Sequence, residues 1–216
     1  MFELLFGLDT MLRRQGKRDR IALTFFNAAA EPGKRLGEKA VTGLLQEMAR
    51  RRIDTHLGHK PLSFSEKGVA TEGGHIDADL ILFMPGLTGP DWALESGLKL
   101  SPGGFFQADA FCRADGVERV FVAGDAGSFP GPDWMPKQAH MADLQAKAAA
   151  ENLSLALEGK PPAARFKIEL ICIVDTIDKG ILVYRDLKHS WLLPSSRLFH
   201  WAKRYFEGHY LKEFRR

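Results

Sequence analysis

The stretch from residue 120 to residue 128, Val-Phe-Val-Ala-Gly-Asp-Ala-Gly-Ser, restricts the possible folds of this chain more than any other. Four consecutive apolar residues, Val120 to Ala123, are typical of a buried parallel strand. Gly124 at the end of this strand lets the backbone come close to a ligand. Asp125 is therefore expected at the carboxyl end of a strand, where open α/β sheets bind ligands and a carboxylate accepts hydrogen bonds from ribose or ribityl hydroxyls. The alternative is that Asp125 caps a helix or turn in a different kind of α/β domain.

A helix is expected to begin shortly after this strand, at Pro136. Proline is favoured at the first position of a helix, and an alanine-rich sequence continues from there to Leu153. The free N–H groups at the start of the helix, together with Lys137, would point at the same crevice as Asp125. Such a helix end favours negative charge, as on a reduced flavin ring.

The two segments are joined by Gly131-Pro132-Asp133-Trp134-Met135 and continue as Pro136-Lys137-Gln138-Ala139-His140. Together they resemble the second FAD-binding motif of flavoproteins with two dinucleotide-binding domains, and most closely that of the sulfide:quinone oxidoreductases and flavocytochrome c sulfide dehydrogenases. The resemblance implies an α/β fold, part of a two-dinucleotide-binding-domain (FAD/NAD(P)-binding, Rossmann-like) flavoprotein with a C-terminal α+β region. It also implies FAD as the cofactor, with contacts from Gly124, Asp125, Pro136, Lys137 and Gln138. Gly124 and Asp125 would hold the ribityl side, and Lys137 and Gln138 would contact the ring or the quinone.

The rest of the chain is expected to form the later part of such a protein. Apolar spacing predicts helices over 2–12, 37–50 and 92–98, strands over 21–26, 53–57, 79–84 and 105–109, a hairpin from 69 to 77, and paired antiparallel strands over 166–175 and 180–185. The strand over 79–84 is expected to be strongly buried. No Gly-x-Gly-x-x-Gly, the usual sign of a pyrophosphate site, precedes a helix.

The resemblance implies three regions. Residues 1–84 would be a partial second, NAD-like nucleotide-binding domain, residues 85–158 the C-terminal part of the FAD-binding domain, and residues 159–216 an interface region with an amphipathic helix. An N-terminal portion of the FAD domain, or a partner chain that supplies it, is expected to be missing from this sequence.

Cys172 is the predicted catalytic residue. The resemblance places a cysteine of this strand on the side of the flavin where sulfide is oxidised, and a thiolate there would attack a sulfur species, form a persulfide or disulfide, and pass the two electrons released to the adjacent flavin. The residues alone leave the alternative of an inert, buried side chain between Ile171 and Ile173. Cys112 lies outside the matching strand and is interpreted as structural. The histidines show no spacing typical of a metal site, and His140 is interpreted as a packing residue or a proton shuttle.

The tail from residue 195 to residue 216 differs from the rest of the chain. Ser195 or Ser196 is expected to cap a helix whose apolar face carries Leu198, Trp201, Ala202, Tyr205, Phe206, Tyr210, Leu211 and Phe214. Basic residues flank this face: Arg197, Lys203, Arg204, Lys212, Arg215 and Arg216. The pattern is typical of a helix lying in a membrane interface, although docking on the missing N-terminal half or on a second subunit would use the same face.

Composition narrows the function classes. A formal charge of +3 in 216 residues gives no reason to expect nucleic-acid binding, and two cysteines do not suggest a disulfide framework. No apolar run is long enough to span a bilayer and no signal peptide is evident, so the expected location is the cytoplasm, with peripheral attachment to the inner face of the cytoplasmic membrane. The predicted function is an FAD-dependent oxidoreductase that oxidises sulfide and passes electrons through flavin to quinone. The alternatives are a flavin-dependent NAD(P)H:quinone reductase and a noncatalytic module that binds FAD only with an N-terminal partner.

Overall fold

The computed structural model describes residues 1–213 and divides into two compact units. Of the described residues, the first unit contains 1–84, 171–185 and 189–213, and the second contains 85–170 and 186–188. Phe214, Arg215 and Arg216, which were expected to extend the tail helix, lie outside the described residues. The division of the chain into three regions stays a prediction.

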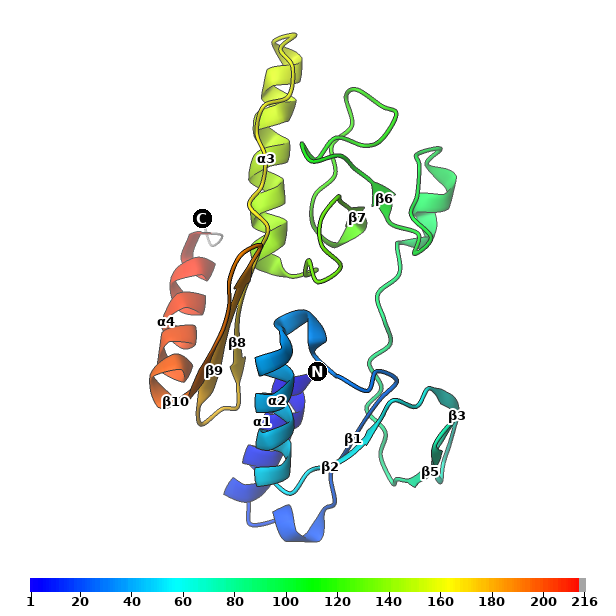
Figure 1. The fold of residues 1–216 in the computed structure, drawn as a ribbon, viewed down its shortest axis with the longest axis vertical. Coiled ribbons are helices and arrows are strands. Elements are labelled where there is room, and N and C mark those ends of the chain that lie inside the picture. Colours follow the sequence, from blue (N-terminus) through cyan, green and yellow to red (C-terminus); the bar gives the residue numbers. More distant parts are fainter. Residues whose placement is uncertain (214–216) are drawn as a thin grey trace. The chain divides into compact units, whose positions relative to one another are not determined.

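Two helices and a parallel strand pair begin the first unit (Figure 1). These elements are α1 (Phe2–Arg14), β1 (Thr24–Asn27), α2 (Glu38–Arg50) and β2 (Asp54–Leu57). β1 pairs with β2 in parallel, from Thr24 opposite Asp54 to Asn27 opposite Leu57. The predicted order of helix, strand, helix, strand is confirmed. Leu44 and Met48 of α2 are buried at helical spacing, and in α1 Phe6 and Leu12 enter the same core, whereas Leu4 and Met11 stay exposed.

A small antiparallel sheet follows, formed by β3 (Pro61–Ser65), β4 (Gly68–Thr71) and β5 (Gly74–Asp77). The hairpin predicted at Gly73-Gly74 is the turn between β4 and β5. The buried strand predicted over 79–84 is wrong: the segment is extended without strand pairing, and Leu80 is 75% exposed. An apolar run indicates affinity for a buried surface, but a strand also requires a hydrogen-bonding neighbour, and no strand of residues 1–213 pairs here. Phe83 instead packs its ring against Phe26 and Phe64.

The end of the chain returns to the first unit as a three-stranded sheet and a helix. The sheet has the order β10-β9-β8, with β8 (Glu169–Asp175), β9 (Gly180–Asp186) and β10 (Ser190–Ser196), and α4 (Arg197–Glu213) follows (Figure 1). The predicted pairing of the first two strands is confirmed. β10 was not predicted, because Pro194 interrupts its pattern; the structure accommodates the proline with a register shift between Leu193 and Ser196.

One hydrophobic core joins the N-terminal helices of the first unit to its C-terminal sheet. Val174 of β8 and Ile181 of β9 are buried in the same cluster as Phe6 of α1 and Met48 of α2. Polar contacts reinforce this packing, since the hydroxyl of Thr10 donates a hydrogen bond to the carbonyl oxygen of Thr176 at 2.8 Å. The C-terminal sheet is therefore held to the helices by side chains that are far apart in sequence.

A buried ionic network lies beside this core. The Asp9 carboxylate, with no exposed side-chain area, accepts hydrogen bonds from Arg13, Arg18 and Arg51. Arg51 also contacts Glu47 of α2 and Asp178 of the turn between β8 and β9. Burial alone raises the pKa of Asp9, but the three guanidinium groups outweigh it and hold this pKa below its usual value. The carboxylate thus stays charged and fixes α1, α2 and the β8–β9 turn together.

The second unit contains the long helix α3 (Ala139–Leu157) and short extended segments. β6 (Phe106–Gln107) pairs in parallel with β7 (Gly127–Ser128), in part confirming the strand predicted over 105–109, and Asp91–Glu95 forms a 3-10 turn where a short helix was predicted. Asn152 of α3 is fully buried and ties the helix to both neighbouring segments: its amide donates to the carbonyl oxygens of Phe111 and Ala164 and accepts from the backbone N–H groups of Ala163 and Ala164.

Two predictions for the second unit are wrong in detail. Residues 120–123 are not a parallel strand: Phe121 forms a single antiparallel bridge with Arg113, and Val122 is buried. Of the four residues only Val122 is fully buried, and the backbone partners of the run come from the loop at residues 112–114 rather than from a neighbouring strand. The helix begins at Ala139 and not at Pro136, because Gln138 has an extended conformation and acts as the N-cap residue.

Candidate functional site

The site is built on a tight turn at Gly124–Ala126, which leads directly into β7. Gly124 has φ of +71°, a left-handed conformation that costs a residue with a side chain about 1–2 kcal/mol. A side-chain carbon added at Gly124 would also lie 3.4 Å from the Cβ of Ala142 in α3. That distance is an ordinary van der Waals contact, so it is the bend that requires glycine at this position.

Side chains from two directions hold the backbone of this turn. The Oε1 atom of Gln145, in α3, accepts a hydrogen bond from the N–H of Gly124 at 2.9 Å. The ammonium group of Lys137 donates to the carbonyl oxygen of Asp125 at 2.8 Å and to that of Gly127. The same ammonium lies 3.9 Å from the centre of the Phe105 ring. The predicted residue Lys137 thus stabilises the turn itself, a role that the sequence did not indicate.

The carboxylate of Asp125 is exposed on this turn. Within residues 1–213 it makes no hydrogen bond or ion pair with another side chain or backbone group. An ionised carboxylate is a pure acceptor, with room for several donors. A fixed backbone that presents an unused acceptor is suited to bind a ligand that carries hydroxyl groups.

Pro136 and Gln138 flank Lys137 in the sequence and lie just before α3. The carbonyl oxygen of Gln138 accepts the bond from Ala142 N that opens the helix, at 3.0 Å. The first N–H groups of α3 have no carbonyl partner within the helix, so this end favours an anion. His140, in the first turn, makes a 2.9 Å contact with Glu169. Burial raises the pKa of Glu169, but hydrogen bonds from Lys167 and His140 outweigh it and lower that pKa.

Cys172 lies on β8 in the first unit, whereas Gly124, Asp125, Pro136, Lys137 and Gln138 all lie in the second. Its side chain is partly buried and packs against the core of the first unit. Burial raises the pKa of the Cys172 thiol, Glu3 raises it further, and Lys203 opposes the shift. The thiol is therefore mainly protonated near neutral pH and reacts slowly as a nucleophile.

Cys112 is fully buried and has a positive φ of +64°. Its S–H donates to the backbone carbonyl oxygen of Gln145 at 3.5 Å. Burial raises the pKa of this thiol to about 12, with the Asp109 carboxylate adding to the shift. These contacts agree with the structural role expected for Cys112.

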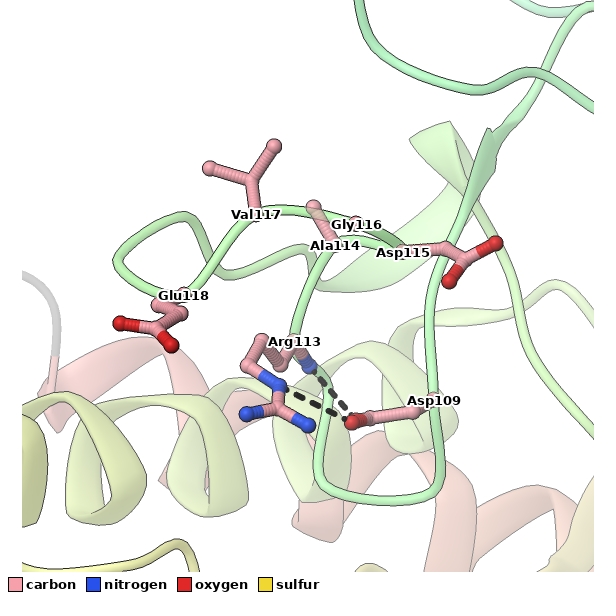
Figure 2. A pocket seen from close by; sticks show the side chains of 7 residues that line it. All are labelled: Asp109, Arg113, Ala114, Asp115, Gly116, Val117 and Glu118. Carbon is pink, nitrogen blue, oxygen red and sulfur yellow. Dashed lines mark hydrogen bonds and ion pairs between the residues drawn. The ribbon is translucent and has the colours of Figure 1, made fainter.

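A separate hollow in the second unit is lined by residues 113–118 and Asp109, three of which carry carboxylates (Figure 2). Asp109 accepts hydrogen bonds from the backbone and the guanidinium of Arg113, and Asp115 and Glu118 lie nearby. Arg113 and Lys99 pair with Asp109 and Asp115, which leaves Glu118 as a net negative charge that does not favour a pyrophosphate group. This hollow is therefore not a suitable place for a dinucleotide.

Sequence reasoning missed Gln145 and Asn152. Both are polar residues on the buried side of α3, together with Met141, Ala148 and Ala149. A polar side chain at helical spacing within an alanine-rich buried face was the signal that could have identified them, because such groups are buried only when they are hydrogen-bonded.

No cluster of three or more histidine, cysteine or acidic side chains in residues 1–213 is arranged to hold a metal ion. Over the same residues, no helix has the length and apolar character needed to cross a bilayer.

Solved structures of several oxidoreductases are similar to this chain. A sulfide:quinone oxidoreductase from the hyperthermophilic bacterium Aquifex aeolicus superposes with a TM-score of 0.90 at 20% identity, over 99% of this chain and 55% of that one. The water-forming NADH oxidase of Lactobacillus brevis, bound to NADH, gives a TM-score of 0.57 at 16% identity, over 78% of this chain and 38% of that one. Putidaredoxin reductase, in a covalent complex with putidaredoxin, gives 0.55 at 17% identity, over 78% and 42% of the two chains.

The comparisons establish the fold. The chain spans about half the length of the sulfide:quinone oxidoreductase, and at these identities the likeness shows the architecture alone. The expected fold, part of a dinucleotide-binding flavoprotein with a C-terminal α+β region, is confirmed. No protein-family model matches the sequence, and no curated protein matches it.

Proposed function

We propose that this chain is the flavin-binding and C-terminal part of an FAD-dependent oxidoreductase that oxidises sulfide and reduces a quinone. The observation that carries the proposal is the Gly124–Ala126 turn, whose backbone is held by Gln145 and Lys137 while the Asp125 carboxylate stays exposed. Similarity over 99% of the chain to a sulfide:quinone oxidoreductase supports it.

In this proposal Asp125 accepts hydrogen bonds from the ribityl hydroxyls of FAD, and the glycine before it allows the close approach. Pro136 and Gln138 lie where the start of α3 would favour the negative charge of a reduced flavin ring. Lys137 would contact the ring or the quinone only by exchanging a contact that it makes to the turn. Bound FAD would supply the chemistry, by taking two electrons from sulfide and passing them to the quinone.

Cys172 is the proposed sulfur carrier. Its raised thiol pKa means that proton removal must accompany attack on sulfur, because the thiolate is the reactive form. The remaining half of the enzyme, an N-terminal FAD-domain portion in the same or a partner chain, is proposed to complete the cofactor site, since the chain spans 55% of the similar oxidoreductase.

The tail helix is proposed to attach the protein to the inner face of the cytoplasmic membrane. His200 contacts Asp175 at 3.0 Å and Lys203 contacts Glu3, so this face of α4 is held to the first unit. The opposite face leaves its large apolar side chains in solvent: Leu198 is 70% exposed, Trp201 60%, Tyr205 78% and Phe206 64%. Aromatic residues on such a face, flanked by Arg197 and Arg204, suit the headgroup region of a bilayer.

The test is the visible absorption spectrum of the purified chain with added FAD, followed by anaerobic addition of sulfide. Flavin that stays with the protein and bleaches with sulfide is the expected result. Flavin that binds but is bleached only by NADH would instead favour the second candidate, a flavin-dependent NAD(P)H:quinone reductase. The burial of Cys172 and the likeness to an NADH-bound oxidase favour that candidate, and it expects a Cys172→Ser variant to keep full activity with NADH.

A protein that releases all FAD would contradict flavin binding by this chain alone. The same titration with the N-terminal half added would then decide whether the chain acts as a noncatalytic module. Binding restored by that half would support the proposed site, and continued release of FAD would reject it.

A further inference from the structure

We infer that Gln145 is a positioning residue for the cofactor site, which fixes the Gly124–Asp125 turn in its ligand-binding conformation. The expected effect on FAD binding rests on the proposed function, whereas the contact between Gln145 and Gly124 exists without any ligand. Gln145 lies in α3 with 4% of its surface exposed, and its Oε1 atom meets the N–H of Gly124 at 2.9 Å.

The Gly124 N–H depends on this side chain. It lies at the start of a 3-10 turn, outside both helix and strand pairing, and Gln145 is its acceptor. A backbone N–H that loses its acceptor in a partly buried place is costly, so the turn would rotate to expose it to water. Rotation at Gly124 is easy, because glycine has the widest choice of backbone conformations, and it would redirect the neighbouring Asp125 carboxylate.

The support on the other side of the turn cannot replace Gln145. Lys137 is a donor and binds the carbonyl oxygens of Asp125 and Gly127, so it offers nothing to an N–H group. Lys137 also follows a loop, whereas Gln145 belongs to the second turn of a regular helix. The position of the turn relative to α3 is therefore set mainly from Gln145.

A further contact lies on the backbone of Gln145, whose carbonyl oxygen accepts the S–H of Cys112 at 3.5 Å. The side-chain amide that meets Gly124 takes no part in this contact, so the two bonds can be altered separately. Gln145 thus connects the loop of Cys112, the helix and the turn of Gly124. Its side chain controls the geometry of Asp125 through Gly124, without touching the ligand.

The experiment compares variants of Gln145 in the full chain by two readouts. Gln145→Met keeps the length of the side chain and removes the acceptor, and Gln145→Glu restores an acceptor. Cys112→Ala is the matched control, because it alters the same buried region and leaves the Gln145–Gly124 bond intact. Hydrogen exchange of the Gly124 amide in the ligand-free chain reports the contact, and quenching of flavin fluorescence reports the Kd for FAD.

Gln145→Met is expected to speed exchange at Gly124 and to raise the Kd for FAD at least about tenfold, as expected for an unsatisfied donor. Gln145→Glu and Cys112→Ala are expected to keep the slow exchange of the Gly124 amide. Should Gln145→Met fail to fold, Gln145→Asn, which is too short to reach Gly124, gives the same comparison.

Slow Gly124 exchange in a folded Gln145→Met variant would overturn the inference. So would fast exchange with an unchanged Kd, because the turn would then be irrelevant to the ligand. If the unmodified chain binds no FAD while exchange responds as expected, the proposed function fails for the isolated chain and the contact stands. If the chain binds FAD but exchange does not respond, the positioning role fails and the proposed function stands.

Discussion

Replacing Asp9 with asparagine is expected to weaken the first unit strongly. Asp9 has no exposed side-chain area, and it accepts bonds from Arg18 at 2.7 Å, Arg13 at 2.9 Å and Arg51 at 3.0 Å. The side chains of Arg18 and Arg51 are only 8% and 5% exposed. Asparagine keeps the size of the side chain but leaves two buried guanidinium groups without this counter-charge.

The expected loss of unfolding free energy follows from this geometry. Removing one partner of a buried ion pair typically costs about 3–5 kcal/mol. Arg51 keeps Glu47 and Asp178 as partners, so the lower end, about 3 kcal/mol, is expected. This is a large part of the roughly 5–15 kcal/mol that stabilises a typical domain.

Urea unfolding followed by circular dichroism, with hydrogen exchange in α1 and α2 to locate the effect, measures this loss. The control is Asp19→Asn, which breaks an exposed contact with Arg52 in the same unit and is expected to leave stability nearly unchanged. Equal midpoints for Asp9→Asn and Asp19→Asn would refute the argument that the network holds α1, α2 and the β8–β9 turn together.

Three further predictions follow from other contacts. The folded-state pKa of Asp9 lies below its unfolded value of about 3.9, so the stability that the carboxylate contributes is present above about pH 3.9 and is lost as the pH falls through the folded pKa. The loss of stability on acidification should therefore be shallower in Asp9→Asn than in the unmodified chain. Parallel acid-unfolding profiles of the two proteins would contradict this. Iodoacetamide should alkylate Cys172 slowly at neutral pH and faster as pH rises, as measured by mass spectrometry, whereas rapid labelling at pH 7 would contradict the raised thiol pKa. Trp201→Ser should reduce co-sedimentation of the protein with anionic vesicles. The control is Leu62→Ser, which replaces a similarly exposed apolar residue of β3. An equal loss of co-sedimentation in both variants would argue against α4 as the attachment site.

Apolar spacing predicted the elements that bury one face against a core. α2 shows this clearly, because Ala40, Leu44 and Met48 recur at helical spacing and are almost completely buried, whereas in α1 Leu4 and Met11 share the apolar spacing but are about half exposed. The cap of α4 was also predictable, since Ser196 Oγ accepts the N–H of Leu198 at 3.1 Å, as the local sequence indicated.

Spacing could not reveal which backbone groups pair. Residues 79–84 and 120–123 have the same apolar character, yet neither becomes a regular strand, because strand formation depends on neighbours that are distant in sequence. β10 was missed for the opposite reason: Pro194 is unfavourable in a strand, but a register shift between Leu193 and Ser196 accommodates it.

The candidate site was only partly predictable. The Gly-Asp pair could be recognised from the sequence, because the bend at Gly124 requires a glycine and the candidate ligand-binding carboxylate, Asp125, follows it directly. The supports are long-range contacts, from Lys137 to two carbonyl oxygens and from Gln145 to one N–H, and nothing local in the sequence specifies them.

The central claim is that the carboxylate of Asp125 binds FAD. The direct measurement is the Kd for FAD, by quenching of flavin fluorescence, in the unmodified chain, in Asp125→Ala and in Asp115→Ala, whose carboxylate contacts Lys99 on the surface. A Kd raised about tenfold or more in Asp125→Ala alone, the loss expected when bonds to a charged group are removed, is the predicted result. Equal affinity in all three proteins would contradict the assignment of the flavin site to this turn.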